Sequence, residues 1–255
     1  DQFLEEIFSK TEAKISLKTR IGMEEPEEFF RLLEIYNKYP LEELIVHPRV
    51  QKELYRGTPH YETFRYAMEH SKNPLCYNGD LVSVDSYVNL LTDWEKEQAC
   101  DRAKVTSVMV GRGVLKDPAL IEKLAAYASG KAYEADEEKK LPAFHDRLVA
   151  DYGKEFSGDQ NVLFKMKELW SYLIVRFPGK EKEAKAIRKA KRLEESQAAV
   201  RRVFRSSRCS FDFFRKKKAE YEAGVQEGIQ KGRASGLAWE KTMNRMRSLK
   251  IRSVS

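Results

Sequence analysis

Four short polar motifs in the first half of the chain have the composition of ligand-binding loops. They are Lys18-Thr19-Arg20, His47-Pro48-Arg49, Asn78-Gly79-Asp80 and Gly111-Arg112-Gly113. Glycine lets backbone N–H groups approach phosphate oxygens closely, and a guanidinium group offers a fork of donors to the same oxygens. The last two motifs therefore have the composition of a phosphate cradle, although an isolated Asn-Gly-Asp is most often a simple turn.

Lys18 and His47 precede the glycine motifs and could serve the same ligand. A lysine that closes an apolar strand could stabilise negative charge on the pyrimidine edge of a flavin, and a histidine could donate to a phosphate or cofactor. Each also has a purely structural interpretation. Lys18 could pair with Glu24 or Glu25, and His47 could close its strand with a satisfied imidazole. Taken together, the order and spacing of the four motifs favour a shared ligand.

The motifs recur at a regular interval, which predicts the elements that carry them. From Lys18 to His47 is 29 residues, from His47 to Asn78 is 31, and from Asn78 to Gly111 is 33. This interval is the length of one βα unit. Each motif ends a short apolar run typical of a buried parallel strand. These runs cover residues 14–20, 43–47, 74–78 and 107–111. Because α/β proteins place chemistry at the carboxyl ends of their strands, we expect the motifs to share one edge of a sheet.

Amphipathic stretches separate and follow the strand-like runs. In the first half they predict helices over residues 25–39, 61–71, 84–91 and 117–128. Later in the chain, where strand-like runs are absent from the sequence pattern, they predict helices over 144–152, 162–177 and 180–204. Four βα units are too few to close an eight-stranded barrel. The pattern therefore predicts either half of a barrel or an open sheet, followed by a helical region.

Positive charge is concentrated at the end of the chain. Residues 201–255 hold 15 Lys or Arg against 5 Asp or Glu, whereas the whole chain carries a net charge of only +7. Glycine recurs at every fourth position from 224 to 236 among polar neighbours, which weakens a helix and does not fit a membrane packing stripe. We expect residues 206–255 to be a basic tail, helical or disordered. It either contacts an anionic partner such as nucleic acid or is simply solvated.

The composition also excludes several classes of protein. No apolar run approaches the length of a membrane span. Cys76, Cys100 and Cys209 are too few and too scattered for a disulfide framework or a zinc site. We therefore expect a cytoplasmic protein that binds no metal and does not enter a membrane.

The ordered motifs resemble those of the tRNA-dihydrouridine synthase family. The similar segments are residues 16–22, 46–49, 77–80 and 108–113, and the resemblance extends over residues 1–205. The family has an FMN-dependent (β/α)8 TIM barrel followed by a helical domain that binds tRNA. The resemblance thus implies an α/β fold that is a partial TIM barrel, with the last four βα units in residues 1–130. The helical tRNA-binding domain would follow in residues 131–205, and the tail in 206–255.

The resemblance also implies roles for individual residues. Lys18 and His47 would bind FMN, Asn78, Gly79 and Asp80 would contact it, and Gly111 with Arg112 would hold its phosphate. The implied activity is the reduction of specific tRNA uridines to 5,6-dihydrouridine, with FMN as the cofactor, NADPH as the reductant and a monomeric enzyme.

Two features depart from the family pattern. Pro48 stands where the family commonly has glycine in its His-x-Arg motif, and proline fixes φ and removes a backbone donor. In addition, the family's first four strands have no counterpart in the sequence. Those strands carry the cysteine that protonates the uracil. We therefore assign no catalytic residue, and we expect the chain by itself to form no dihydrouridine.

Two other functions fit the same residues. Other FMN barrels, such as the dihydroorotate dehydrogenase-like enzymes, share phosphate-binding motifs of this kind but lack the helical domain. A non-catalytic RNA-binding module would use the basic helices and tail without any flavin. Flavin absorbance would separate the two enzymes from the module, and tRNA binding would separate the two enzymes from each other.

Overall fold

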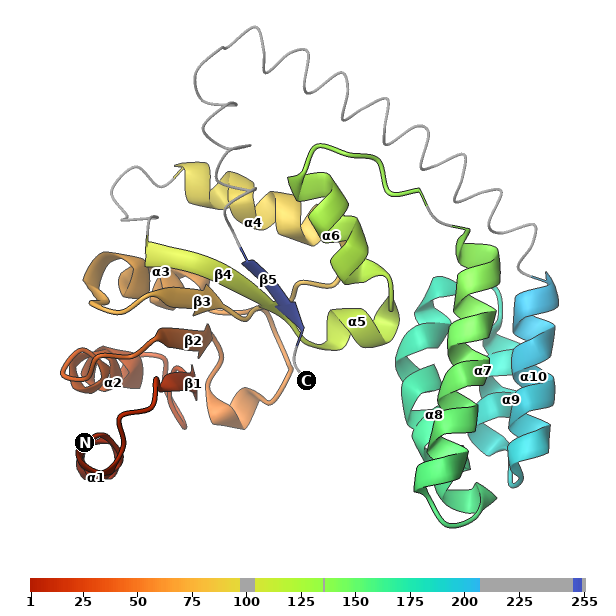
Figure 1. Ribbon diagram of the computed structural model, residues 1–255. Helices are drawn as coiled ribbons and strands as arrows, with labels where there is room; N and C mark the ends of the chain where they lie inside the picture. The colour runs from red at the N-terminus through yellow and green to blue at the C-terminus, as the bar shows by residue number, and fades with distance from the viewer. Residues whose placement is uncertain (97–103, 135, 207–249, 254–255) are drawn as a thin grey trace, which may run out of the picture. The chain divides into compact units, whose positions relative to one another are not determined.

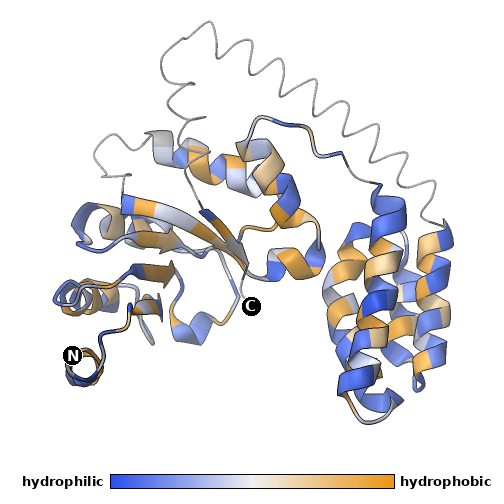
Figure 2. Ribbon diagram, in the orientation of Figure 1, coloured by the Kyte–Doolittle hydropathy of each residue, from blue (hydrophilic) through white to orange (hydrophobic). Residues whose placement is uncertain are grey.

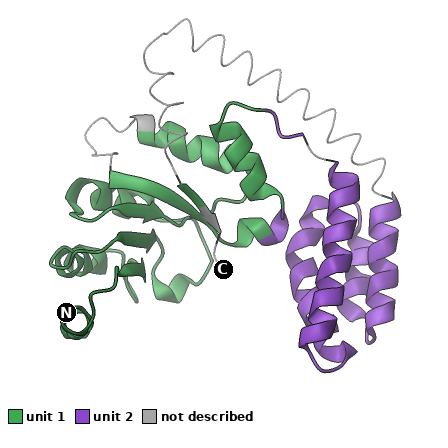
Figure 3. Ribbon diagram, in the orientation of Figure 1, with its two compact units in different colours: residues 1–114, 119–131, 242–255 green, residues 115–118, 132–241 purple. Residues whose placement is uncertain are grey.

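The computed structural model describes residues 1–96, 104–134, 136–206 and 250–253 (Figure 1). The chain divides into two compact units (Figure 3). Unit 1 comprises residues 1–114, 119–131 and 242–255, and unit 2 comprises residues 115–118 and 132–241.

Unit 1 is built on a parallel β-sheet whose strand order follows the sequence. The strands are β1 (Ser16–Arg20), β2 (Glu43–His47), β3 (Leu75–Tyr77), β4 (Val105–Val110) and β5 (Lys250–Ser253). The register places Arg20 beside His47, and Val46 beside Tyr77, so the carboxyl ends of these strands meet at one edge. The predicted parallel α/β fold is confirmed, and the sheet with its helices fits part of a TIM-like barrel.

Helices alternate with these strands along the chain. They are α1 (Gln2–Lys10), α2 (Glu28–Tyr36), α3 (Tyr61–His70), α4 (Val84–Lys96), α5 (Arg112–Lys116) and α6 (Leu120–Ala128), with a short 3-10 helix η1 (Gln51–Glu53) after β2. Figure 1 shows α4 and α6 side by side over the sheet. The sequence pattern did not predict α1 or α5, and α5 is too short to present a periodic apolar face.

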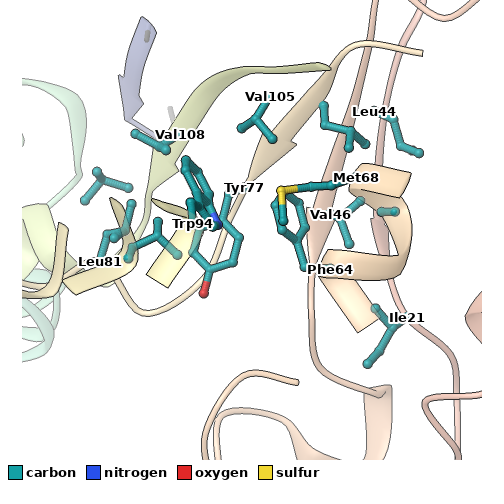
Figure 4. Close-up of a cluster of buried hydrophobic side chains, with 14 of the residues drawn as sticks. Ile21, Leu44, Val46, Phe64, Met68, Tyr77, Leu81, Trp94, Val105 and Val108 are labelled. Carbon is teal, nitrogen blue, oxygen red and sulfur yellow. The ribbon is translucent and has the colours of Figure 1, made fainter. Parts of the chain in front are cut away.

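The main core of unit 1 lies between one face of the sheet and its helices (Figure 4). Leu44 and Val46 of β2 contribute to it with Val108 of β4. The ring of Tyr77 packs edge-on against Phe64 at a centroid distance of 4.8 Å and against Trp94 at 5.9 Å. Such aromatic contacts fix the ring of Tyr77, the last residue of β3, and so they fix the start of the Asn78 loop.

The opposite face of the sheet carries both apolar and polar residues. Ile45, Cys76 and Met109 form a small buried cluster there. Near the amino ends of the strands, the buried carboxylate of Glu43 accepts a hydrogen bond of 2.6 Å from the Ser107 hydroxyl. His47 shares this face with Ile45, because alternate residues of a strand point to the same side.

In its last described residues, the tail differs from the prediction that it is helical or disordered. Residues 250–253 form β5, which pairs in parallel with β4 and places Ile251 beside Val108. Ile251 also packs against the core of unit 1. An edge strand offers a row of unpaired backbone groups, which explains why a short segment with one apolar residue is held there. The sheet thus has five described strands instead of four, and the glycine repeat at 224–236 lies outside the described residues.

The described part of unit 2 contains α7 (Glu137–Glu155), α8 (Asp159–Leu173), η3 (Ile174–Arg176), α9 (Glu181–Lys189) and α10 (Leu193–Ser206). Figure 2 shows apolar and hydrophilic residues alternating along these helices, as expected for amphipathic helices around a core that includes Trp170 and Phe177. The single helix predicted over 180–204 is in fact two helices. The break falls at Ala190, whose extended ψ of 135° ends α9 and whose carbonyl accepts a hydrogen bond from Lys167.

Candidate functional site

Three of the predicted site residues, His47, Asp80 and Arg112, belong to one network of contacts at the carboxyl edge of the sheet. Asp80 follows β3 and accepts two hydrogen bonds from Arg49, of 2.9 and 2.7 Å. Arg112 follows β4 and donates to the same carboxylate at 3.1 Å. The Arg49 guanidinium also lies 3.4 Å from Nε2 of His47. Arg49 and Asp80 therefore link His47 to Arg112 in one polar network.

Arg49 was not among the predicted site residues, although it belongs to the His47-Pro48-Arg49 motif. Its side chain is fully buried. Besides Asp80, it donates to the carbonyl oxygens of Arg56 at 3.3 Å and Gly57 at 2.8 Å. The Asp80 carboxylate raises the pKa of Arg49, and the Arg49 guanidinium in turn lowers the pKa of Asp80. A buried charge is tolerated when it is paired and hydrogen-bonded, and Arg49 satisfies both conditions.

The loop after β2, residues 48–57, is held over this network by Arg20 as well as Arg49. Arg20 donates to the carbonyl oxygens of Val50 at 2.9 Å and Leu54 at 3.0 Å. Leu54 has a φ of +54°, which is uncommon for a residue with a side chain. The next residue, Tyr55, places its ring 3.9 Å from the Arg112 guanidinium carbon, a cation–π contact that the sequence pattern did not indicate.

His47 is buried among cations at the end of β2. Burial, together with the charges of Arg20 and Lys18, lowers its pKa to about 4. The imidazole is therefore neutral at pH 7. Because a guanidinium group can only donate hydrogen bonds, the contact with Arg49 makes Nε2 the acceptor and leaves the ring proton on Nδ1. His47 thus offers one N–H donor at the strand edge and carries no charge.

The neutral state of His47 predicts how the stability of the chain depends on pH. An unfolded histidine titrates near pH 6.5, whereas folded His47 titrates near pH 4, so the unfolded chain takes up the proton first. The neutral state of folded His47 therefore contributes to the free energy of unfolding. The contribution is complete above pH 6.5 and is lost as the pH falls from 6.5 to 4, by on the order of 3 kcal/mol in total. Urea unfolding at several pH values should show that His47→Gln lacks this part of the dependence. Identical pH profiles for the two proteins would contradict the assignment.

Asn78 and Gly79 shape the loop after β3. The Asn78 side-chain amide donates to the carbonyl oxygen of Met109 at 2.9 Å, which ties this loop to β4. Its Oδ1 has no hydrogen-bond partner among the described residues, so one acceptor is left for a ligand. A Cβ atom at Gly79 would lie 2.0 Å from the Tyr77 hydroxyl oxygen. Glycine is therefore required by local packing, whatever the loop binds.

Replacing Gly79 by alanine should destabilise unit 1. Tyr77 cannot move away easily, because its ring is buried between Phe64 and Trp94. We expect a loss of about 2–3 kcal/mol in the free energy of unfolding, as for other overpacked cores, measured by urea denaturation. Gly153→Ala is the matched control: nothing lies within 4 Å of the added Cβ in α7, so helix propensity should make it neutral or stabilising. Equal effects of the two substitutions would refute this account of Gly79.

Lys18 and Gly111, the remaining predicted site residues, lie outside this polar network of hydrogen bonds and ion pairs. Lys18 lies on β1 in register with Ile45, and its side-chain ammonium makes no hydrogen bond or ion pair with any described residue. Gly111 begins the turn into α5, and its carbonyl oxygen accepts from Val114 at 3.2 Å. At Gly113 in α5, a Cβ atom would lie 2.3 Å from the Leu81 carbonyl oxygen, so the backbone at the start of α5 packs tightly against the loop after β3.

The carboxyl edge of the sheet is therefore strongly cationic. Lys18, Arg20, Arg49 and Arg112 lie there, and Asp80 is the one carboxylate joined to the network by the described contacts. The protein is thus a parallel α/β protein whose strand ends carry a cluster of cations, a charge distribution that suits an anionic ligand. The described residues contain no group of three or more His, Cys, Asp or Glu that could hold a metal ion. Within the same described ranges, no helix combines the length and the apolar character needed to cross a membrane.

Comparison with known proteins identifies the family of this site. The model of the dihydrouridine synthase (Dus) family matches residues 1–205, which include the whole polar network. The chain belongs to the dihydrouridine synthase family.

Individual relatives are distant and longer. A probable tRNA-dihydrouridine synthase of Rickettsia prowazekii is 27% identical over 164 residues, which cover 60% of this chain and 47% of the relative. The tRNA-dihydrouridine synthase B of Shewanella oneidensis is 23% identical over 175 residues, 67% of this chain and 51% of the relative. For the tRNA-dihydrouridine(16) synthase of Pseudomonas putida, the identity is 26% over 47% of this chain and 34% of the relative. The chain thus spans about half the length, or less, of these curated relatives.

Proposed function

We propose that this chain contributes the phosphate-binding part of an FMN site to an enzyme that reduces uridines in tRNA to 5,6-dihydrouridine. The proposal rests mainly on the position of Arg112. Its guanidinium is held at the carboxyl edge of the sheet by Asp80 and the ring of Tyr55. Family membership supplies the reaction class, and the names of the relatives supply the substrate. NADPH is the proposed reductant.

The residues at the sheet edge fit FMN. A phosphate monoester suits Arg112 and the backbone of Gly111, because a charged fork and an open backbone both favour phosphate oxygens. Lys18 and the neutral His47 would hold the ring system, with His47 donating from Nδ1. The free Oδ1 of Asn78 would accept from a ring N–H. When bound, FMN supplies hydride transfer to the uracil ring.

Unit 2 is the proposed tRNA-binding part. Residues 180–206 contain ten Lys or Arg against four Asp or Glu, so α9 and α10 present a net positive surface. Lys182, Lys185 and Lys189 of α9 are all exposed, and their spacing places them on one side of the helix. Such a row suits the phosphate backbone of RNA. We further propose that the protein is cytoplasmic and monomeric and that it uses no metal.

Removing this row of lysines should reduce the salt dependence of tRNA binding. If all three contact phosphates, the slope of log K against log salt should fall by about 2 in the Lys182→Ala, Lys185→Ala, Lys189→Ala triple variant. A control with the same change in net charge replaces Lys10, Lys14 and Lys72, which are exposed on unit 1. Filter binding or fluorescence anisotropy with tRNA measures both. Equal slopes for the two triple variants would remove α9 from the proposed interface.

A comparison of two flavins tests the cofactor proposal. FMN and riboflavin differ only in the phosphate, so the ratio of their affinities isolates the phosphate site. We expect the chain to bind FMN at least about tenfold more tightly than riboflavin, as one charge-assisted phosphate contact requires. Quenching of flavin fluorescence measures both affinities, and weak binding is sufficient because the result is a ratio. Equal affinities would overturn the proposed phosphate site.

A further inference from the structure

We propose that Asp80 is a positioning residue: it orients the Arg112 guanidinium toward the cofactor phosphate and does not touch the cofactor itself. This inference rests on the proposed function, because it takes a phosphate monoester as the ligand of Arg112. It also replaces the role suggested for Asp80 by the family resemblance, which is direct contact with FMN.

The Asp80 carboxylate is already engaged by two guanidinium groups. Its Oδ1 accepts from Arg49 at 2.9 Å and from Arg112 at 3.1 Å, and its Oδ2 accepts from Arg49 at 2.7 Å. A carboxylate beside a phosphate would also repel it, since both groups are anionic. The contribution of Asp80 to phosphate binding must therefore pass through the arginine that it holds.

Arg112 is held on two sides but retains free donors. The Tyr55 ring covers the guanidinium at 3.9 Å, and Asp80 takes one hydrogen bond from Nη2. The Nε and Nη1 donors have no acceptor among the described residues. A guanidinium group that is fixed in this way loses little side-chain entropy when an anion binds to its remaining donors.

Both supports of Arg112 depend on the loop of residues 48–57. Tyr55 belongs to this loop, and Asp80 is held by Arg49, which donates to the carbonyl oxygens of Arg56 and Gly57. Arg49 is fully buried, whereas Arg112 keeps 31% of its side chain exposed. Arg49 thus fixes the position of Asp80, and Asp80 holds Arg112. Arg112 is the more exposed arginine and the one that can face a ligand.

The test compares FMN with riboflavin in Asp80→Asn. This change keeps the shape of the side chain and removes the charge that holds Arg112. We expect FMN affinity to fall about tenfold and riboflavin affinity to stay unchanged, so the preference for FMN is lost. Asp80→Glu should restore part of the preference. Asp85→Asn is the matched control, since it removes one exposed carboxylate from the start of α4, outside the network.

A double variant separates positioning from folding. Asp80→Asn leaves the buried Arg49 without its carboxylate and could unfold the loop. Arg49→Met with Asp80→Asn removes the buried cation together with its partner, so no unpaired buried charge destabilises the loop. Arg112 still lacks the Asp80 carboxylate in this double variant. We expect this double variant to bind riboflavin normally and to show no preference for FMN. A return of that preference would mean that Asp80 acts only through the fold.

The remaining outcomes distinguish this inference from the proposed function. If the unmodified chain prefers FMN and Asp80→Asn keeps that preference, the positioning role is wrong while the phosphate site stands. If the unmodified chain has no preference for FMN over riboflavin, the proposed function fails and the role of Asp80 fails with it.

Discussion

Arg49→Met should produce the largest loss of stability of any single substitution in the polar network. The substitution removes the counter-charge of Asp80 and the donors to the carbonyl oxygens of Arg56 and Gly57. Breaking a fully buried ion pair costs about 3–5 kcal/mol, but 38% of the Asp80 side chain is exposed, so we expect about 2–3 kcal/mol. Hydrogen–deuterium exchange should show the loss first in the amides of residues 50–57, and urea denaturation should give its size.

Arg31→Met is the control for this prediction. It makes the same substitution on the exposed side of α2, outside the network, and should change neither the exchange of residues 50–57 nor the free energy of unfolding. If Arg49→Met left the exchange of this loop unchanged, the loop would not depend on Arg49, and the coupling between the loop and Arg112 would have to be abandoned.

Arg112→Ala should produce the largest loss of cofactor binding. A charge-assisted contact with phosphate is worth about 1.5–3 kcal/mol, which corresponds to a loss of about 10- to 100-fold in FMN affinity. Riboflavin affinity should not change, because riboflavin has no phosphate. Stability should also change little, since the ion pair with Asp80 is partly exposed and surface pairs contribute little.

The same flavin titration checks this prediction, with Arg31→Ala as the matched loss of one exposed arginine. Arg31→Ala should leave both affinities unchanged. An equal weakening of FMN and riboflavin by Arg112→Ala would place Arg112 against the ring system and would rule out a phosphate contact.

Local sequence patterns predicted the scaffold of unit 1 well. The run at 43–47 coincides with β2, because five consecutive residues there are buried and the flanking residues are polar or proline. The regular spacing of Lys18, His47, Asn78 and Gly111 correctly predicted parallel strands joined by helices. Such features depend on the residues of one segment and are therefore visible without the rest of the fold.

Contacts between distant segments were not predictable in this way. Arg49 and Asp80 are 31 residues apart, and their ion pair exists only because the register of β2 and β3 brings their loops together. The contact of Tyr55 with Arg112 depends on the path of a loop in which Leu54 adopts an uncommon φ. Strand β5 is held by pairing with β4, far away in the sequence, and four residues with one apolar side chain carry no strong local signal.

The proposed roles of Lys18, His47, Asn78, Gly79, Gly111 and Arg112 in binding FMN stay predictions, as does the use of NADPH. The contacts among these residues show which of the proposed roles depend on one another. Arg49 contacts both His47 and Asp80, and Asp80 in turn contacts Arg112, so the positions of these residues depend on one another. A variant that removes Asp80 should therefore weaken FMN binding through Arg112, even though Asp80 touches no flavin atom.

The most direct test of the proposed function is the dihydrouridine content of tRNA in the source organism. We expect deletion of the gene to abolish dihydrouridine at one or more tRNA positions, as measured by nucleoside mass spectrometry and by mapping the modified sites. The unmodified gene and its Asp85→Asn version should restore the modification, and the Arg112→Ala version should not. Unchanged dihydrouridine at every tRNA position after deletion, or full restoration by Arg112→Ala, would contradict the account.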